Sequence, residues 1–123
     1  MQVFLSVLLA MFVAMSSGLA QDSGTTCLIY GPPYQLASDT AVWTMSIGSG
    51  QSCIRGLRSS FVTLDSTKLV VPPRSGQVKL EGLGFVYRSN PDFRGEDSFT
   101  ISVSGKLNKI NGSSMIRVVV SVR

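Results

Sequence analysis

An alternation of apolar and hydroxylated side chains is the feature of this sequence that most constrains its fold. From Asp97 to Ser104 every second side chain is apolar and those between are hydroxylated, with Phe99, Ile101 and Val103 set among Ser98, Thr100, Ser102 and Ser104. Successive side chains of a β-strand point to opposite faces, so such a segment buries one face and exposes the other. After the N-terminal apolar run, the sequence shows no 3.6-residue period of an amphipathic helix. The sequence therefore predicts an all-β protein.

The C-terminal residues 115–123 repeat this alternation, with one face formed by Ile116, Val118, Val120 and Val122 and the other by Arg117, Ser121 and Arg123. A shift of one residue would carry the arginines into the core, so the register of this strand is well specified. The dipeptide Asn111-Gly112 tolerates the positive φ angles of tight turns. We therefore expect a terminal hairpin that turns at Asn111-Gly112, and we favour this turn over an N-glycosylation site at Asn111.

Six shorter segments also have strand-like patterns and are separated by turns that contain Gly, Pro, Ser or Asn, namely 26–30, 41–47, 52–54, 68–71, 77–80 and 85–87. Roughly seven to nine short strands separated by such turns are typical of a sandwich or a barrel. We predict a single immunoglobulin-like antiparallel β-sandwich over residues 21–123.

The N-terminus has the pattern of an export signal. Residues 3–15 are apolar except for Ser6, and this run is shorter than the ~20 residues that a helix needs to cross a bilayer. Gly18 and Ala20 provide the small side chains that a signal peptidase accepts, so we predict a signal peptide over residues 1–20. Because no Lys or Arg precedes the apolar run, an uncleaved anchor stays open as the alternative. We expect a secreted or periplasmic protein without membrane insertion after cleavage.

The chain has two cysteines, Cys27 and Cys53, and both follow the expected cleavage point. In an exported chain an even pair most simply forms one disulfide. A redox or metal site needs more ligands than two thiols, and the chain contains no His. The sequence therefore predicts a structural Cys27–Cys53 bridge.

The C-terminal half resembles the bacterial cadherin-like and immunoglobulin-like repeats of envelope and adhesion proteins. Residues 73–78 match the Pro-x-x-Gly-x-Val element of those repeats, and a second element is matched by Tyr87, Phe93, Gly95, Asp97, Ser98 and Phe99. The resemblance covers roughly residues 70–122 and implies an immunoglobulin-like sandwich. Physically, Gly95 permits a sharp turn, and Asp97 can accept backbone N–H bonds across that turn. The N-terminal half departs from the pattern, so we do not expect an antibody-type disulfide between the sheets.

The residue types present argue against catalysis. Without His, the Ser-His-Asp and Cys-His arrangements cannot form. Asp92, Glu96 and Asp97 are candidate calcium ligands, but we favour a turn with capping carboxylates. Glu96 and Asp97 are neighbours and would point to opposite faces of a strand, which makes a poor catalytic dyad. We expect neither an enzyme nor a bound cofactor or metal.

The remaining hypotheses concern binding. The net charge of +4 is scattered along the chain, and we expect no nucleic-acid partner. Our leading interpretation is an interaction or structural module that binds an unknown protein or glycan of the cell envelope through its surface. One alternative is a secreted inhibitor or effector that uses a disulfide-braced loop over residues 51–60, with Arg55 and Arg58 as contacts. The other is a small carbohydrate-binding module with Trp43, Phe61 and Tyr34 as an aromatic platform.

Overall fold

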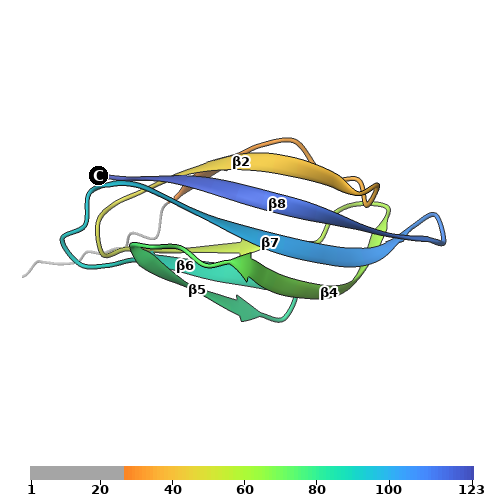
Figure 1. Cartoon of the computed structure of the whole chain (residues 1–123). Helices are drawn as coiled ribbons and strands as arrows, with labels where there is room; N and C mark the ends of the chain where they lie inside the picture. Colours follow the sequence, from red (N-terminus) through yellow and green to blue (C-terminus); the bar gives the residue numbers. More distant parts are fainter. Residues whose placement is uncertain (1–26) are drawn as a thin grey trace, which may run out of the picture.

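The computed structural model describes residues 27–123, and the predicted signal peptide lies outside the described residues. The described chain is all-β, as predicted, and contains no helix that could cross a membrane. Its strands, shown in Figure 1, are β1 (Leu28–Tyr30), β2 (Asp39–Ile47), β3 (Ser52–Gly56), β4 (Val62–Val71), β5 (Gly76–Glu81), β6 (Gly84–Ser89), β7 (Gly95–Leu107) and β8 (Ile110–Val122).

The strands form two sheets that lie face to face, as in a β-sandwich (Figure 1). One sheet has five strands in the order β1-β2-β8-β7-β4, and the other has three in the order β3-β6-β5. The prediction of a wholly antiparallel sandwich is wrong, because β2 runs parallel to β8 from Asp39↔Ser114 to Ile47↔Val122. Only a hairpin forces neighbouring strands to be antiparallel. Since the chain passes between the two sheets four times from β2 to β8, their relative direction is not fixed in this way.

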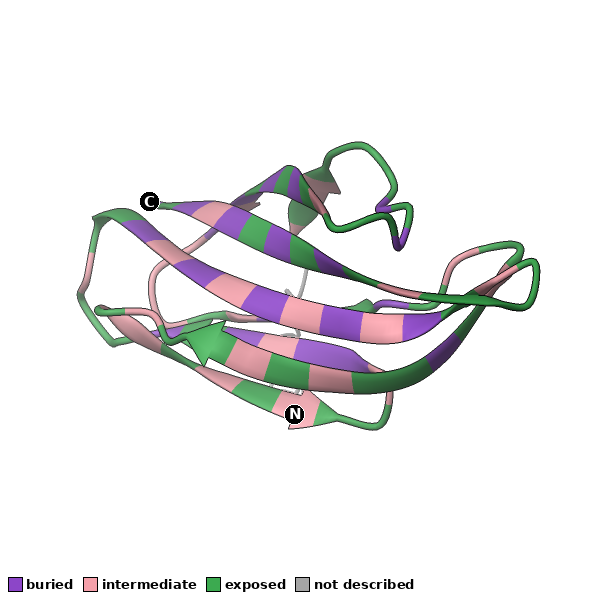
Figure 2. Cartoon of the chain, turned by 45° about the vertical axis from the view of Figure 1, so that its right-hand side comes forward, coloured by how far each residue is buried: buried purple, intermediate pink, exposed green. Residues whose placement is uncertain are grey.

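The predicted inward faces of the long strands meet in one core. Figure 2 shows buried residues alternating with less buried ones along β7 and β8. The Phe99 ring lies between two rings of the opposite sheet, stacked on Tyr87 at 5.5 Å and edge-on to Phe85 at 5.2 Å. Such aromatic packing stabilises a sandwich beyond its buried area. The core side chains of the five-stranded sheet include Trp43, Met45, Ile47, Ile101, Val103, Ile116, Val118, Val120 and Val122.

The terminal hairpin is confirmed, but its predicted turn is wrong. The turn lies at Asn108-Lys109, whose φ angles are 51° and 68°, and the flanking pair is Leu107↔Ile110. The dipeptide Asn111-Gly112 lies inside β8 instead. A Cβ atom at Gly112 would collide with the backbone carbonyl of Leu36. Glycine at position 112 therefore allows the segment at Leu36 to approach β8 closely, and local turn preferences do not reveal this role.

β4 is longer than its predicted residues 68–71. Its pairing with β7 shifts register between Leu64 and Ser66 and again between Leu69 and Val71. Each shift interrupts the two-residue period, so the alternation is lost in the sequence although the strand continues. β4 is also an edge of the five-stranded sheet. Bulges, and the Pro72-Pro73 sequence that follows, are devices that protect an exposed edge.

Candidate interaction surface

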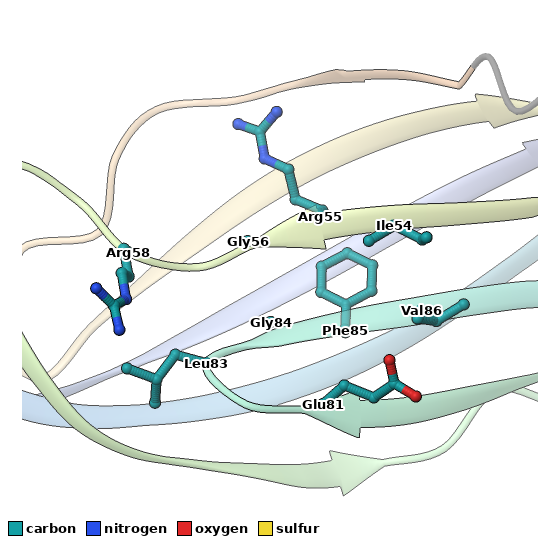
Figure 3. A pocket seen from close by; sticks show the side chains of 9 residues that line it. All are labelled: Ile54, Arg55, Gly56, Arg58, Glu81, Leu83, Gly84, Phe85 and Val86. Carbon is teal, nitrogen blue, oxygen red and sulfur yellow. The ribbon is translucent and has the colours of Figure 1, made fainter.

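A hollow of about 370 Å³ opens on the three-stranded sheet where two glycines face each other across β3 and β6. Gly56 and Gly84 are cross-strand partners, and a Cβ atom at Gly84 would lie 2.8 Å from the carbonyl oxygen of Arg55. The next outward-facing pair, Ile54 and Val86, contributes apolar side chains to the hollow (Figure 3). Ile54 is 76% exposed. The hollow therefore combines bare backbone with an accessible aliphatic side chain.

Charged side chains border this hollow. Arg55 and Arg58 both line it, as does Glu81, whose carboxylate is 3.4 Å from the ammonium of Lys79. Figure 3 shows the guanidinium groups of Arg55 and Arg58 directed to different sides. The guanidinium of Arg55 lies 5.4 Å from the centroid of the Trp43 ring, a cation–π distance. The structure thus places both predicted arginines at one hollow but does not join them into one cationic cluster.

The segment that follows β3 is anchored at a single residue. Leu57 is buried, and its backbone N–H donates to the carbonyl of Leu83 at 2.9 Å. The hydroxyl of Tyr34 donates to the carbonyl of Leu57 at 2.5 Å, and burial raises the pKa of that hydroxyl. Because the backbone of Leu57 is fixed from both sides, the exposed side chain of Arg58 extends directly from an anchored point of the backbone.

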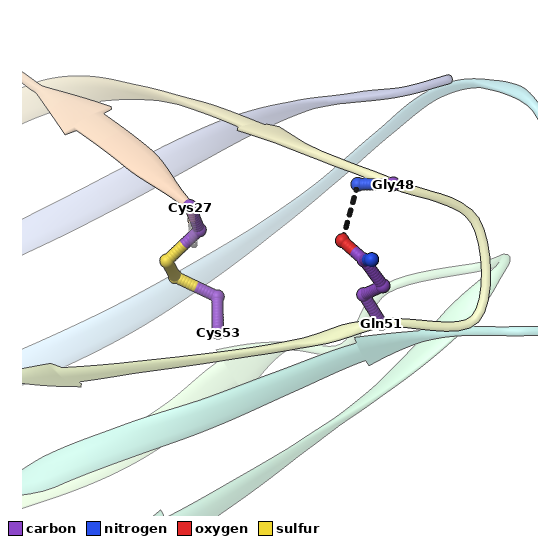
Figure 4. The surroundings of a disulfide bond; sticks show 4 residues. All are labelled: Cys27, Gly48, Gln51 and Cys53. Carbon is purple, nitrogen blue, oxygen red and sulfur yellow. Dashed lines mark hydrogen bonds between the residues drawn. A yellow bond between two sulfur atoms is a disulfide. The ribbon is translucent and has the colours of Figure 1, made fainter. Parts of the chain in front are cut away.

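The predicted disulfide is confirmed and braces β3 (Figure 4). Cys27, directly before β1, is bonded to the fully buried Cys53 of β3, with 5.7 Å between their Cα atoms. Since β1 is an edge of the five-stranded sheet and β3 an edge of the three-stranded one, the bond joins the two sheets. The pairing is as predicted, but a bond between the sheets is contrary to the expectation drawn from the departure of the N-terminal half from the antibody pattern.

The three carboxylates considered for calcium do not converge. Asp92 and Glu96 are exposed, whereas Asp97 is turned inward. The Oδ1 atom of Asp97 accepts the backbone N–H groups of Arg74 and Ser98, both at 2.9 Å. Within residues 27–123, no group of three or more His, Cys, Asp or Glu side chains is placed to hold a metal ion. Asp97 accepts backbone N–H bonds as expected, but they come mainly from the β4–β5 crossover.

The other oxygen of Asp97 completes this network. Oδ2 accepts the backbone N–H of Ser75 at 3.1 Å and the hydroxyl of Tyr87 at 3.0 Å. Burial, and then the adjacent Asp97 carboxylate, raise the pKa of Tyr87, so its hydroxyl stays a proton donor. Asp97 therefore ties β7 to the crossover and to β6. Its role is structural.

The aromatic residues considered for carbohydrate binding do not form a platform. Trp43 and Tyr34 are core residues, and the Trp43 indole N–H donates to the carbonyl of Pro32 at 2.7 Å. Only Phe61 is accessible, with 88% of its surface exposed. A single ring offers no extended stacking surface for a sugar.

Asp39 holds the segment that crosses from β1 to β2. Its Oδ1 atom accepts the Ser114 hydroxyl at 2.6 Å and the Ala37 N–H at 3.0 Å, and Oδ2 accepts the Gln35 N–H at 3.0 Å. The Ser114 hydroxyl is the main cause that lowers the pKa of Asp39 from 3.8. A lowered folded-state pKa means that this carboxylate stabilises the fold above pH 3.8 and loses that effect as the pH falls through the lowered value.

We therefore expect the free energy of unfolding of the Asp39→Asn variant to depend less on acidification than that of the native chain. The variant is less stable than the native chain at neutral pH, and the difference stays constant on acidification until the pH falls below 3.8, where it narrows as Asp39 of the native chain becomes protonated. Urea unfolding as a function of pH measures the effect. Asp92→Asn, at an exposed loop carboxylate, is the matched control. A constant difference between Asp39→Asn and the native chain at all pH values would contradict the assignment.

Comparison of the sequence with protein-family models and with curated proteins gives no match.

Proposed function

We propose that this chain is an exported, non-enzymatic interaction module of the cell envelope, secreted or periplasmic, with an immunoglobulin-like sandwich. It binds a protein or glycan partner through the hollow at Gly56 and Gly84. The disulfide is compatible with an oxidising compartment, where such bonds persist.

The strand order supports the immunoglobulin-like assignment. In such sandwiches the second, fifth and fourth strands lie in one sheet, and the third strand pairs with the closing hairpin in the other. Here β3, β6 and β5 take the places of the second, fifth and fourth strands in one sheet. β4 takes the place of the third strand and pairs with the β7–β8 hairpin in the other sheet. The resemblance of residues 70–122 to cadherin-like and immunoglobulin-like repeats points the same way.

The placement of the polar groups favours binding over chemistry. The carboxylates of Asp39 and Asp97 accept hydrogen bonds from backbone N–H groups and hydroxyls, so both are committed to holding loops. The exposed side chains at the hollow are those of Ile54, Arg55, Arg58 and Glu81, and the Glu81 carboxylate is paired with Lys79. Arginine is enriched among the residues that dominate binding energy at protein interfaces.

One observation carries the proposal, namely that the hollow lies on a strand held rigid by a covalent bond. Ile54 and Arg55 directly follow Cys53, and Leu57 anchors the next segment in the core. A surface fixed in this way loses little conformational entropy when a partner binds. The same observation supports the inhibitor or effector hypothesis, since that function would use the same braced residues. The identity of the captured partner distinguishes the two functions.

Site-specific photocross-linking in the native envelope tests the proposal. A photoreactive amino acid at position 54 is expected to capture a defined partner, whereas the same group at position 44, on the outer face of β2, is expected to capture none. Arg58→Ala should then weaken binding of that partner about tenfold. Arg88→Ala, at an exposed arginine of β6 outside the hollow, is the matched control. Equal capture at both positions, or equal effects of both arginine variants, would reject the hollow as the binding surface.

A further inference from the structure

Two exposed apolar side chains stand on neighbouring segments at the end of the sandwich where the β7–β8 hairpin turns. Val62 pairs with Leu107, and Leu107 pairs with Ile110, so Phe61 lies next to the row that contains Ile110. Both the hairpin turn and the β3–β4 loop lie at the right-hand end in Figure 1. Phe61 is 88% exposed and Ile110 is 70% exposed. We call Phe61, Lys109 and Ile110 the hairpin-end surface.

The backbone at Phe61 gives a second, independent indication. Its φ angle is +67°, in the left-handed region that bulky side chains avoid. A phenylalanine there gains almost no burial, because most of its surface faces solvent. Glycine or asparagine would adopt this backbone more easily. A strained and exposed aromatic residue contributes little to folding and is more consistent with a contact outside the chain.

One cation of the hairpin-end surface has no acidic partner. Asp65 of β4 lies 3.5 Å from Lys106 of β7, so this acidic side chain already has a lysine partner. Lys109, in the hairpin turn beside Ile110, is exposed and has no ion-pair partner among residues 27–123. The hairpin-end surface therefore presents apolar tips beside a free cation.

We propose that the hairpin-end surface docks the protein onto an anionic lipid surface, with Phe61 and Ile110 entering the headgroup region. Aromatic side chains favour the membrane interface, and cations beside them are attracted to anionic headgroups. The two apolar residues stand on a turn and a loop that project from the fold, and a lipid surface accepts such tips without a complementary cavity. This contact needs no membrane-spanning segment. It is separate from the partner-binding hollow, because none of the three residues lines that hollow.

Vesicle co-sedimentation of the exported protein tests this proposal. Vesicles of phosphatidylcholine with about one-third phosphatidylglycerol are expected to bind the protein at least tenfold more strongly than vesicles of phosphatidylcholine alone. Phe61→Asn, which suits the positive φ, should weaken binding to the anionic vesicles about tenfold, because an apolar group no longer leaves water. Lys109→Asn should weaken it about fivefold and reduce its dependence on salt.

The controls remove similar groups elsewhere. Tyr30→Ser deletes an aromatic residue that is 64% exposed on β1, and Arg94→Asn deletes an exposed cation just before β7, at the opposite end. Both should bind the vesicles like the native chain. Ile110→Thr gives a second apolar test if Phe61→Asn fails to fold in circular dichroism. Equal binding to both kinds of vesicle, equal losses in the controls, or binding to a soluble acidic polysaccharide but not to vesicles would each overturn the proposal.

Discussion

Removal of the Cys27–Cys53 bridge by the paired substitutions Cys27→Ala and Cys53→Ala is expected to lower the free energy of unfolding by about 3–4 kcal/mol. The bond closes a loop with a sequence separation of 26, and loop-closure entropy in the unfolded chain gives about this value. Cys53 is fully buried, so its truncation adds the effect of a small cavity. For a domain of this size the thermal midpoint should fall by roughly 15 °C or more.

Thermal and urea unfolding with and without reductant measure this effect. Reductant should destabilise the native protein by a similar amount and leave the doubly substituted chain unchanged. Hydrogen exchange should also accelerate selectively in β3, since the bond holds this strand against the segment before β1. An unchanged midpoint in the substituted chain would show that packing alone holds the two sheets together.

A structural feature of this chain can be predicted from the sequence only where residues close together in the sequence specify it. β7 and β8 are predictable because each buries every second side chain over most of its length, and this leaves a two-residue period in the sequence. The first half of β4 has no recognisable two-residue period in the sequence, because register shifts in its pairing with β7 interrupt that period. The hairpin was placed correctly, but its turn was not, since Asn108-Lys109 adopts the required positive φ angles without a glycine. Gly112, the expected turn residue, is instead needed because a Cβ atom there would collide with the backbone carbonyl of Leu36.

The hollow could not have been predicted from local patterns. Gly56 and Gly84 become neighbours only through the register of β3 with β6, and neither glycine stands in a motif. The parallel pairing of β2 with β8 is likewise a property of the completed sheet. Arg55 and Arg58 are candidate contacts in the sequence because they follow Cys53 closely. Nothing in the sequence indicates that the Trp43 ring lies beneath the guanidinium of Arg55. Phe61 was considered only as part of an aromatic platform, and its exposure is decided by the backbone around it.

Asp97→Asn is expected to lower the free energy of unfolding by about 3 kcal/mol, although it changes a single oxygen to an amide nitrogen. Four donors point at the carboxylate, namely the N–H groups of Arg74, Ser75 and Ser98 and the hydroxyl of Tyr87. An amide keeps one acceptor atom and sets its own N–H donors against two of these groups. Leaving buried donors without acceptors costs about 1–3 kcal/mol each, and more where the acceptor is charged.

Two further variants separate this network from a general effect of charge. Glu96→Gln removes the neighbouring carboxylate, which is exposed, and should change stability by less than about 0.5 kcal/mol. Tyr87→Phe removes one donor and should cost about 1 kcal/mol. In the double variant the loss of stability should be smaller than the sum of the two single losses, because the hydrogen bond between the two side chains can be removed only once. Strict additivity in urea unfolding would show that the two groups act independently, and that β6 and β7 are joined by apolar packing alone.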